Sequence, residues 1–281
     1  MIVARTIAEL ATACATLRRR GHGLALVPTM GALHAGHRAL VSAAVATGAA
    51  TAASIFVNPL QFAANEDLSR YPRDEPGDLA QLRSVGCDLV WMPDVRVMYP
   101  PGDVSLVDVA GPPAERWEAA HRPGHFRGMA TVVTKLFAQV RPDAAYFGEK
   151  DWQQLQVVRR FVADLHMPLS IVGVPTVREA DGLALSSRNR FLTASDRATA
   201  PLLHETLSAI AITLADGTFA ASVIPDATAR LTVAGFAVDY LALVAGLSLA
   251  PLEKIEADAR LIVAARLGNV RLIDNIAAVP S

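Results

Sequence analysis

Two histidines with two residues between them are the clearest chemical feature of this sequence. They are His34 and His37 in the stretch PTMGALHAGH, residues 28–37. The stretch follows an apolar run and opens a segment with helical spacing, so both rings should lie on one face of a helix, at its first turn. The unpaired N–H groups and the positive dipole end of such a turn attract anions. Gly31 and Gly36 carry no Cβ and would let a ligand approach the backbone closely.

Three interpretations of the histidine pair are open on this evidence. The rings could cap the helix or lie at the surface, they could donate hydrogen bonds to phosphate oxygens, or they could ligate a metal ion. Zinc is the weakest of the three, because an HxxH spacing without a third ligand nearby is a poor zinc signal. The stretch is neither HExxH nor a Walker loop, since no GK[ST] follows it.

A lysine and a serine–arginine cluster follow later in the chain. FGEKD (147–151) ends a predicted strand, so Lys150 should lie at the carboxyl edge of a sheet, where an ammonium group can meet a phosphate as a point charge. SSRNR (186–190) places two hydroxyls and two guanidiniums in a loop, a composition that suits phosphate recognition. Taken alone, each cluster is more simply explained by solvated or capping side chains.

Neutral amides form a third kind of cluster. NPLQF (58–62) supplies Asn58 and Gln61 beside apolar Phe62, and two glutamines at 153–154 open a further predicted helix. Amides among apolar residues suit a small hydroxylated acid, although surface amides are the simpler explanation for each one alone. All of these clusters fall at predicted strand ends or at a domain junction, where one crevice could collect them.

The first half of the chain alternates short apolar runs with amphipathic segments. Strands are predicted at 23–29, 51–57, 87–93, 144–148 and 169–175. Helices are predicted at 34–47, 75–86, 128–140 and 151–166. The histidines of HRPGH (121–125) are predicted to lie in a loop, and a contribution to the site is the alternative. This alternation predicts an α/β fold, a Rossmann-like doubly wound parallel sheet whose ligands bind beyond the carboxyl ends of the strands.

The pattern changes near residue 176, which predicts two domains, 1–176 and 177–281. The second should be a smaller α+β domain that closes over the site as a lid. Its predicted helices are 195–215 and 221–234, and its predicted strands are 237–244, 259–267 and 270–276.

Composition limits the class of protein. Hydrophobic residues make up 52% of the 281 residues and charged residues 19%, so the chain can bury a large core and is not disordered. A formal net charge of −1 counts against non-specific nucleic-acid binding. The N-terminus lacks a signal-peptide pattern, no apolar run reaches the roughly 18 residues of a membrane span, and two cysteines far apart in sequence are typical of reduced thiols. We therefore expect a cytoplasmic protein without nucleic-acid or membrane partners.

Six motifs in this order closely resemble the pantothenate synthetase family. They are PTMGALHAGH, FVNPLQF, YPR, GHFRGMATVVTKLF, FGEKDWQQL and LSSRNRFL, and the resemblance runs from about residue 23 to 192. The HxGH element also resembles the nucleotidyltransferase signature of class I aminoacyl-tRNA synthetases. The resemblance implies an amide-forming ligase of pantothenate and coenzyme A biosynthesis, which joins (R)-pantoate to β-alanine with ATP and Mg²⁺ through a pantoyl-adenylate and releases AMP and pyrophosphate. It further implies a Rossmann domain with a small lid domain, and a homodimer.

The resemblance also assigns residues, motif by motif. The catalytic, charge-stabilising residues would be His34, His37, Lys150, Ser186, Ser187 and Arg188. The ATP site would comprise Met30, Gly31, Ala32, Leu33, His34, Ala35, Gly36, His37, Gly148, Glu149, Lys150, Asp151, Val177, Leu185, Ser186, Ser187 and Arg188. Pantoate would be held by Gln61 and Gln154, with Asn58 beside them, and no side chain is predicted as a metal ligand.

Two positions depart from the usual family pattern. Ala35 stands where an acidic residue is frequent, and Leu185 stands where methionine is common. Neither side chain is expected to take part in the chemistry. Two alternatives remain: another adenylyl-transferring enzyme on the same fold, or a non-catalytic nucleotide-binding protein. The first should add an anticodon domain or a basic face if it acted on tRNA, and the second would bind ATP without forming AMP.

Overall fold

The computed structural model of the chain describes residues 1–62, 68 and 71–280. The chain forms two compact units. The first unit comprises Met1–Ala110, Arg122–Glu149 and Val157–Pro175. The second comprises Gly111–His121, Lys150–Gln156 and Thr176–Ser281. Its longest run thus begins at Thr176, and its two shorter segments lie within the first predicted domain.

The first unit is built on a six-stranded parallel sheet. In chain order its strands are β1 (Ile2–Ala4), β2 (Leu24–Thr29), β3 (Ala50–Ile55), β4 (Leu89–Trp91), β5 (Ala144–Gly148) and β6 (Ser170–Val174). Their spatial order is β1-β4-β3-β2-β5-β6, and every pairing is parallel. The chain moves outward from β2 in one direction through β3 and β4, and in the other through β5 and β6. The order therefore reverses between β2 and β5, which confirms the predicted doubly wound sheet.

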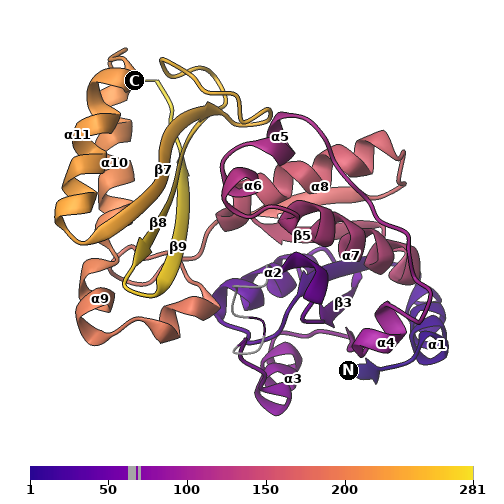
Figure 1. The fold of residues 1–281 in the computed structure, drawn as a ribbon. Helices are drawn as coiled ribbons and strands as arrows, with labels where there is room; N and C mark the ends of the chain where they lie inside the picture. Colours follow the sequence, from indigo (N-terminus) through magenta and orange to yellow (C-terminus); the bar gives the residue numbers. More distant parts are fainter. Residues whose placement is uncertain (63–67, 69–70, 281) are drawn as a thin grey trace. The chain divides into compact units, whose positions relative to one another are not determined.

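Helices cover both faces of this sheet (Figure 1). They are α1 (Ile7–Arg18), α2 (Ala35–Val45), α3 (Glu75–Ser84), α4 (Val95–Met98), α7 (His125–Val140) and α8 (Trp152–Asp164). Side chains alternate along β2, so Ala25 and Val27 pack in one core with Val41 of α2. The other face of β2 is buried as well, and α1 and α7 contact this strand. A strand buried on both faces explains the unbroken apolar run that predicted it.

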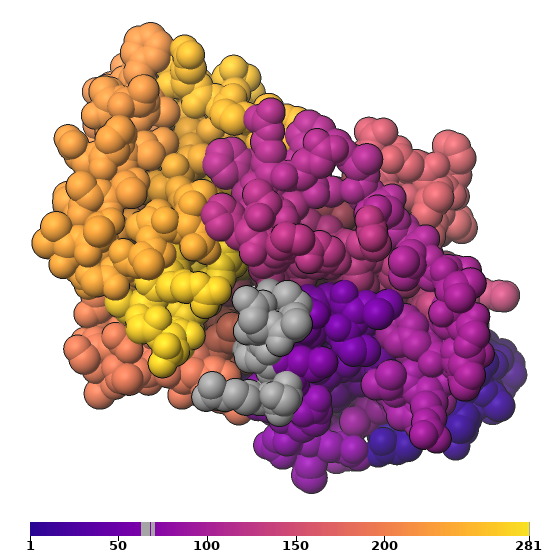
Figure 2. All heavy atoms as spheres, in the orientation of Figure 1, coloured from indigo at the N-terminus to yellow at the C-terminus, as the bar shows by residue number. Residues whose placement is uncertain are grey.

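The second unit contains a three-stranded antiparallel sheet. Its strands are β7 (Phe236–Ala245), β8 (Ala259–Leu267) and β9 (Val270–Ala277), in the spatial order β7-β8-β9. Its helices are α5 (Pro112–Glu115), α6 (Glu118–His121), α9 (Ala194–Thr199), α10 (Leu202–Leu214) and α11 (Ala220–Val233). Helices α10 and α11 lie side by side along one face of the sheet (Figure 1). Their orange side chains adjoin the yellow side chains of the strands in the space-filling view (Figure 2).

The two faces of this smaller sheet have different cores. Leu261 and Val263 of β8 pack into the core that α10 and α11 complete. Ile262, between them in sequence, belongs to a second core with Trp117 and Trp152. The short segments 111–121 and 150–156 thus contribute to the opposite face of the sheet.

Most predicted elements match observed ones to within a few residues, but two predictions were wrong. The predicted helix 195–215 is two helices, α9 and α10, because proline cannot donate the backbone hydrogen bond of a helix interior and Pro201 instead stands just before α10. His121 and His125 do not lie in a loop, since the first ends α6 and the second begins α7. Among the described residues, no helix has both the length and the apolarity needed to cross a membrane.

Candidate functional site

His34 and His37 are held by the backbone of the helix that they open. His34 is the N-cap of α2, and its Nδ1 accepts a hydrogen bond from the Gly36 N–H at 3.2 Å. The Nδ1 of His37 accepts from the His34 N–H at 3.3 Å, which completes a capping box. The two ring centroids lie 4.1 Å apart. The capping interpretation of the pair is therefore confirmed.

This arrangement also fixes the tautomer of each neutral ring. A ring nitrogen that accepts a hydrogen bond carries no proton, so the proton of each neutral imidazole sits on Nε2. The Nε2–H of each ring thus lies at the first turn of α2, where the helix dipole is positive. Capping and anion binding are thus compatible roles for the same side chains. Among the described residues, no group of three or more His, Cys, Asp or Glu side chains could hold a metal ion.

A buried carboxylate supports the loop that leads to these histidines. Asp78 of α3 accepts hydrogen bonds from the backbone N–H groups of Ala32, at 2.9 Å, and Leu33, at 2.8 Å. Gly31 has a φ of +79°, and a Cβ there would lie 2.9 Å from the carboxylate, so glycine is required on both counts. Thr29 adds to the support by accepting from the Gly31 N–H at 3.2 Å.

Asp78 was not predicted from the sequence, although a signal exists. It lies four residues before Leu82, and both are buried on one face of α3. An acidic residue on the buried stripe of a helix needs a partner. That spacing could have marked Asp78 as a supporting residue.

Asn58 and Gln61 lie together in the first unit, in and before the 3₁₀ turn Pro59–Gln61. The Asn58 amide donates to Gln61 Oε1 at 3.1 Å and to the Gly128 carbonyl at 3.0 Å. Its Oδ1 accepts from the Tyr99 hydroxyl at 2.7 Å. Burial raises the pKa of Tyr99, and nearby Asp103 raises it further, so the hydroxyl remains a donor. Asn58 is 1% exposed, so its amide contacts only the protein interior, where it supports the side chain of Gln61.

Further contacts fix the backbone and amide of Gln61. Its Nε2 contacts the Met30 sulfur at 3.2 Å, and its carbonyl accepts from His125 Nδ1 at 2.9 Å. The guanidinium of Arg122 reaches the other ring nitrogen of His125 at 3.1 Å. A Cβ on Gly128 would lie 2.1 Å from the Leu60 carbonyl, so only glycine allows α7 to approach this turn. Arg122 and Gly128 are supporting residues that sequence reasoning did not identify, whereas a contribution of His125 was the alternative to a loop position.

Of the remaining predicted residues, some lie at the carboxyl end of β5 and the others belong to the second unit. Gly148 ends β5 and Glu149 follows it in the first unit, whereas Lys150, Asp151 and Gln154 belong to the second. The Lys150 side chain is 18% exposed, and its Nζ lies 3.7 Å from Asp151 Oδ1.

The serine–arginine segment is the continuation of a short hairpin. The Leu185 N–H donates to the Val177 carbonyl at 3.0 Å, and Arg178 forms a β-bridge with Ala184. Ser186 then caps the 3₁₀ helix Ser187–Phe191, with its Oγ accepting from the Arg188 N–H at 3.3 Å. Backbone pairing at 177–185 therefore sets the start of this segment.

A parallel sheet with a strand-order reversal next to a helix that presents N–H donors is typical of nucleotide-binding α/β enzymes. Residues 2–277 match the family model described as pantoate-beta-alanine ligase. The chain is 56% identical to the pantothenate synthetase of Granulibacter bethesdensis over 278 residues, which cover 98% of this chain and 96% of that protein. It is also 56% identical to the pantothenate synthetase of Acidiphilium cryptum, with 99% and 100% of the two chains covered.

Solved structures give the same result. The crystal structure of pantothenate synthetase from Thermus thermophilus has a TM-score of 0.94 and 49% identity, and both chains are covered completely. The structure of pantoate-beta-alanine ligase from Francisella tularensis, described as complexed with beta-gamma ATP and beta-alanine, has a TM-score of 0.85 and 33% identity, with 99% and 98% covered. The chain belongs to the pantoate–β-alanine ligase family, and it is an amide-forming ligase.

Proposed function

We propose that the protein forms pantothenate from (R)-pantoate and β-alanine with ATP, through a pantoyl-adenylate, and releases AMP and pyrophosphate. The observation that carries this proposal is the pair of histidines, which the capping box holds together at the first turn of α2 with their ring centroids 4.1 Å apart. Family membership supports the same reaction. The F. tularensis relative, described with ATP and β-alanine, supports the choice of these ligands.

The first step is a displacement at phosphorus. A pantoate carboxylate oxygen forms a bond to the α-phosphorus of ATP, and the bond to the departing pyrophosphate breaks. Negative charge builds on the α-phosphoryl group and on pyrophosphate, so the protein acts mainly by positioning and by charge stabilisation. The groups that we assign to this role are His34, His37, Lys150, Ser186, Ser187 and Arg188.

ATP is proposed to lie along the loop and helix start from Met30 to His37. Small residues there would let a ligand approach the backbone closely, and the Asp78 carboxylate keeps the loop in shape. Further nucleotide contacts are assigned to Gly148, Glu149, Lys150, Asp151, Val177 and Leu185–Arg188. Mg²⁺ is expected to be carried by the ATP phosphates, where it would neutralise charge on the departing pyrophosphate. The imidazole, ammonium and guanidinium groups assigned to the nucleotide would meet phosphate oxygens, and the ion would take its ligands from phosphate and water.

Pantoate is proposed to bind through Gln61 and Gln154. Asn58 uses its amide within the protein, so we assign it the task of orienting Gln61. In the second step the β-alanine amine attacks the adenylate carbonyl, the C–N bond forms, and the bond to AMP breaks as the amine loses its proton. His37 is a suitable hydrogen-bond donor to the leaving group, because an imidazole N–H can stabilise the negative charge that builds there.

An acyl adenylate hydrolyses when water reaches it. We therefore propose that the second domain closes as a lid and excludes water from the intermediate. We expect small-angle scattering to show compaction when ATP and pantoate are added together, and unchanged profiles would contradict this closure. We further propose a homodimer in the cytoplasm, and sedimentation of the purified protein would measure the assembly state.

The first experiment measures AMP release from ATP and Mg²⁺ with pantoate, with β-alanine added or withheld. We expect sustained AMP formation only with both substrates. His37→Ala and Lys150→Ala should each lower it by about 10²–10³-fold, since each removes one preorganised charge-stabilising contact. Two matched controls, His22→Ala and Lys254→Ala, replace exposed residues of the same types and should leave the rate unchanged. A wild type that binds ATP without forming AMP would instead indicate a non-catalytic nucleotide-binding protein.

A further inference from the structure

Strand β9 carries two adjacent buried polar residues, Asp274 and Asn275, each only 4% exposed. Burial of a carboxylate and an amide is unfavourable unless both are hydrogen-bonded. Successive side chains of a strand point to opposite faces of the sheet. The pair therefore reaches both faces from one point on the strand, and each residue contacts a different segment of the second unit.

Asp274 lies on the face covered by α10 and holds the hairpin 177–185. Its two carboxylate oxygens accept from the two terminal nitrogens of Arg178 at 2.6 and 2.9 Å. The same guanidinium donates to the Gly182 carbonyl at 3.0 Å, at the turn of the hairpin. The bidentate pair thus ties the hairpin to β9, and the segment Ser186–Arg188 continues directly from it.

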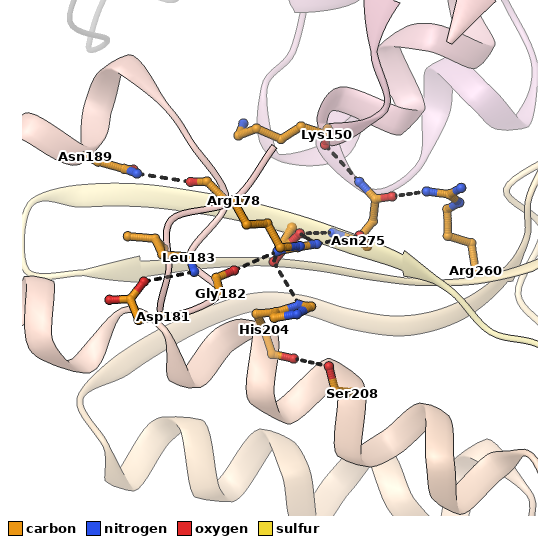
Figure 3. Close-up of polar contacts among 12 residues, drawn as sticks. Lys150, Arg178, Asp181, Gly182, Leu183, Asn189, His204, Ser208, Arg260 and Asn275 are labelled. Atoms are coloured by element: carbon orange, nitrogen blue, oxygen red, sulfur yellow. Dashed lines mark hydrogen bonds and ion pairs between the residues drawn. The ribbon is translucent and has the colours of Figure 1, made fainter. Parts of the chain in front are cut away.

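Asn275 lies on the opposite face and holds the backbone of Lys150. Its Nδ2 donates to the Lys150 carbonyl at 2.9 Å. Its Oδ1 accepts from Arg260, whose guanidinium lies 3.4 Å from the centre of the Trp152 ring. Figure 3 shows the Lys150 side chain extending away from this contact, so Asn275 binds the base of the lysine and leaves the ammonium group to other contacts.

We propose that Asp274 and Asn275 are positioning residues for adenylate formation: Asn275 sets the position of Lys150, and Asp274 sets that of Ser186–Arg188. This inference rests on the proposed function of those two segments. Lys150 and the serine–arginine segment are separated in sequence. Strand β9 contacts Lys150 through Asn275, and through the adjacent Asp274 it contacts the hairpin that leads into the serine–arginine segment. Charge-stabilising groups act only when they are correctly placed, and a misplacement of about 1 Å can lower a rate by about 10²-fold.

The test for Asn275 is a double-mutant cycle with Lys150. Asn275→Asp keeps the shape of the side chain and an acceptor for Arg260, but it removes the donor to the Lys150 carbonyl. Asn275→Ala removes both contacts without adding charge. Each should lower pantoate-dependent exchange of pyrophosphate into ATP, measured without β-alanine, by about 10–10²-fold. In a Lys150→Ala background the same changes should lower the rate by less than about 2-fold, because interacting residues are not additive.

The test for Asp274 is a second double-mutant cycle, which combines Asp274→Asn with Arg188→Ala in the same assay. Here too, the loss of exchange rate in the double variant should be smaller than the two single losses combined. Leu272→Ala serves as the control for stability, since it opens a cavity on β9 without touching either polar contact. All variants are measured at a temperature at which circular dichroism shows them folded. Leu272→Ala should retain the wild-type exchange rate.

The outcomes separate this proposal from the proposed function. Active wild type with non-additive losses in both cycles would support the positioning roles. Active wild type with additive losses, or with coupling in one cycle alone, would overturn the shared role of the pair. A wild type without exchange, or a Lys150→Ala variant with full exchange, would overturn the proposed function or its assignment of Lys150, and this inference with it.

Discussion

The loop and helix start around His34 and the segments around Lys150 and Ser186–Arg188 are assigned the same task, yet they are held in different ways. The histidines bond to backbone groups within three residues of themselves, and Thr29 bonds to Gly31 two residues away. The second set is anchored over long distances in the chain. Arg178 is 96 residues from Asp274, and Lys150 is 125 residues from Asn275.

This difference determines what each region depends on. A motif whose hydrogen bonds are local keeps much of its geometry wherever a strand and a helix flank it. Helix α3 adds support to the first region through Asp78 and Gln81. The second set has its geometry only when β9 is in register, because β9 supplies both anchors. Substitutions far from the proposed chemistry should therefore disturb the second region more than the first.

The largest effect is expected from Arg178→Met, which would leave the buried Asp274 carboxylate without its bidentate partner. Removing one member of a buried pair typically lowers the free energy of unfolding by about 3–5 kcal/mol, whereas replacing both by apolar residues costs much less. The double variant Arg178→Met, Asp274→Leu should therefore be more stable than the single one. Urea unfolding followed by circular dichroism measures both. Equal stabilities would show that the anchor is not the charge pair.

The next effect in size separates the two roles of His34. Asparagine is a good N-cap, so His34→Asn should keep the free energy of unfolding within about 0.5 kcal/mol of wild type, whereas His34→Ala should lose about 1 kcal/mol. Both remove Nε2, and both should lower AMP formation by about 10²–10³-fold, or about 2.7–4 kcal/mol in the activation free energy. Full activity in His34→Asn would mean that the ring is a cap only.

The same contrast explains what could be predicted from the sequence. The parallel sheet followed from alternating apolar and amphipathic runs, because strands buried on both faces read as continuous apolar segments. The histidine motif could be placed at a helix start because its geometry is local. Strand β1 and helix α1 were not predicted, and the 195–215 segment was read as one helix despite Pro201.

The supports of the candidate site were not predictable in the same way. Asp274 and Asn275 occupy a strand correctly predicted at 270–276, but no local pattern says which distant groups a buried polar residue will bond. Gly128 and His125 became supporting residues only when α7 was seen to contact the turn at Leu60. Long-range partners depend on the fold, so sequence reasoning identified the groups assigned to chemistry better than the groups that hold them.

A smaller effect is expected from Asp78→Asn, which weakens the support that α3 gives to the first region. The amide can accept from only one of the two N–H groups of Ala32 and Leu33, and leaving a buried donor unsatisfied costs about 1–3 kcal/mol. Urea unfolding should show a loss in this range, and AMP formation should fall as the loop moves. The control is Asp164→Asn, which alters an exposed carboxylate paired with Arg160. Unchanged activity together with reduced stability would show that the histidines keep their geometry without Asp78.

The smallest expected effect is a pH dependence that arises in the second region. Burial lowers the pKa of His204 from its ordinary value of 6.5, and Arg178 lowers it further, while Asp274 and Glu205 oppose the shift. Its Nδ1 is buried 3.8 Å from Asp274 Oδ2 and has no hydrogen-bond partner among the described residues. The unfolded chain therefore binds more protons at this residue than the folded chain does below pH 6.5.

Stability rises with pH wherever the unfolded state binds more protons, so this histidine should make the protein lose stability as the pH falls below about 6.5. His204→Gln removes that contribution, and all other titratable groups are common to both proteins. Between pH 7.5 and pH 5.5, the urea midpoint of the wild type should therefore fall more than that of His204→Gln. His166→Gln, at an exposed position, is the control and should give a curve parallel to wild type. If the His204→Gln curve is also parallel to that of the wild type, protonation of His204 does not affect the anchor around Asp274. The two regions would then differ only in where their supports lie in the chain.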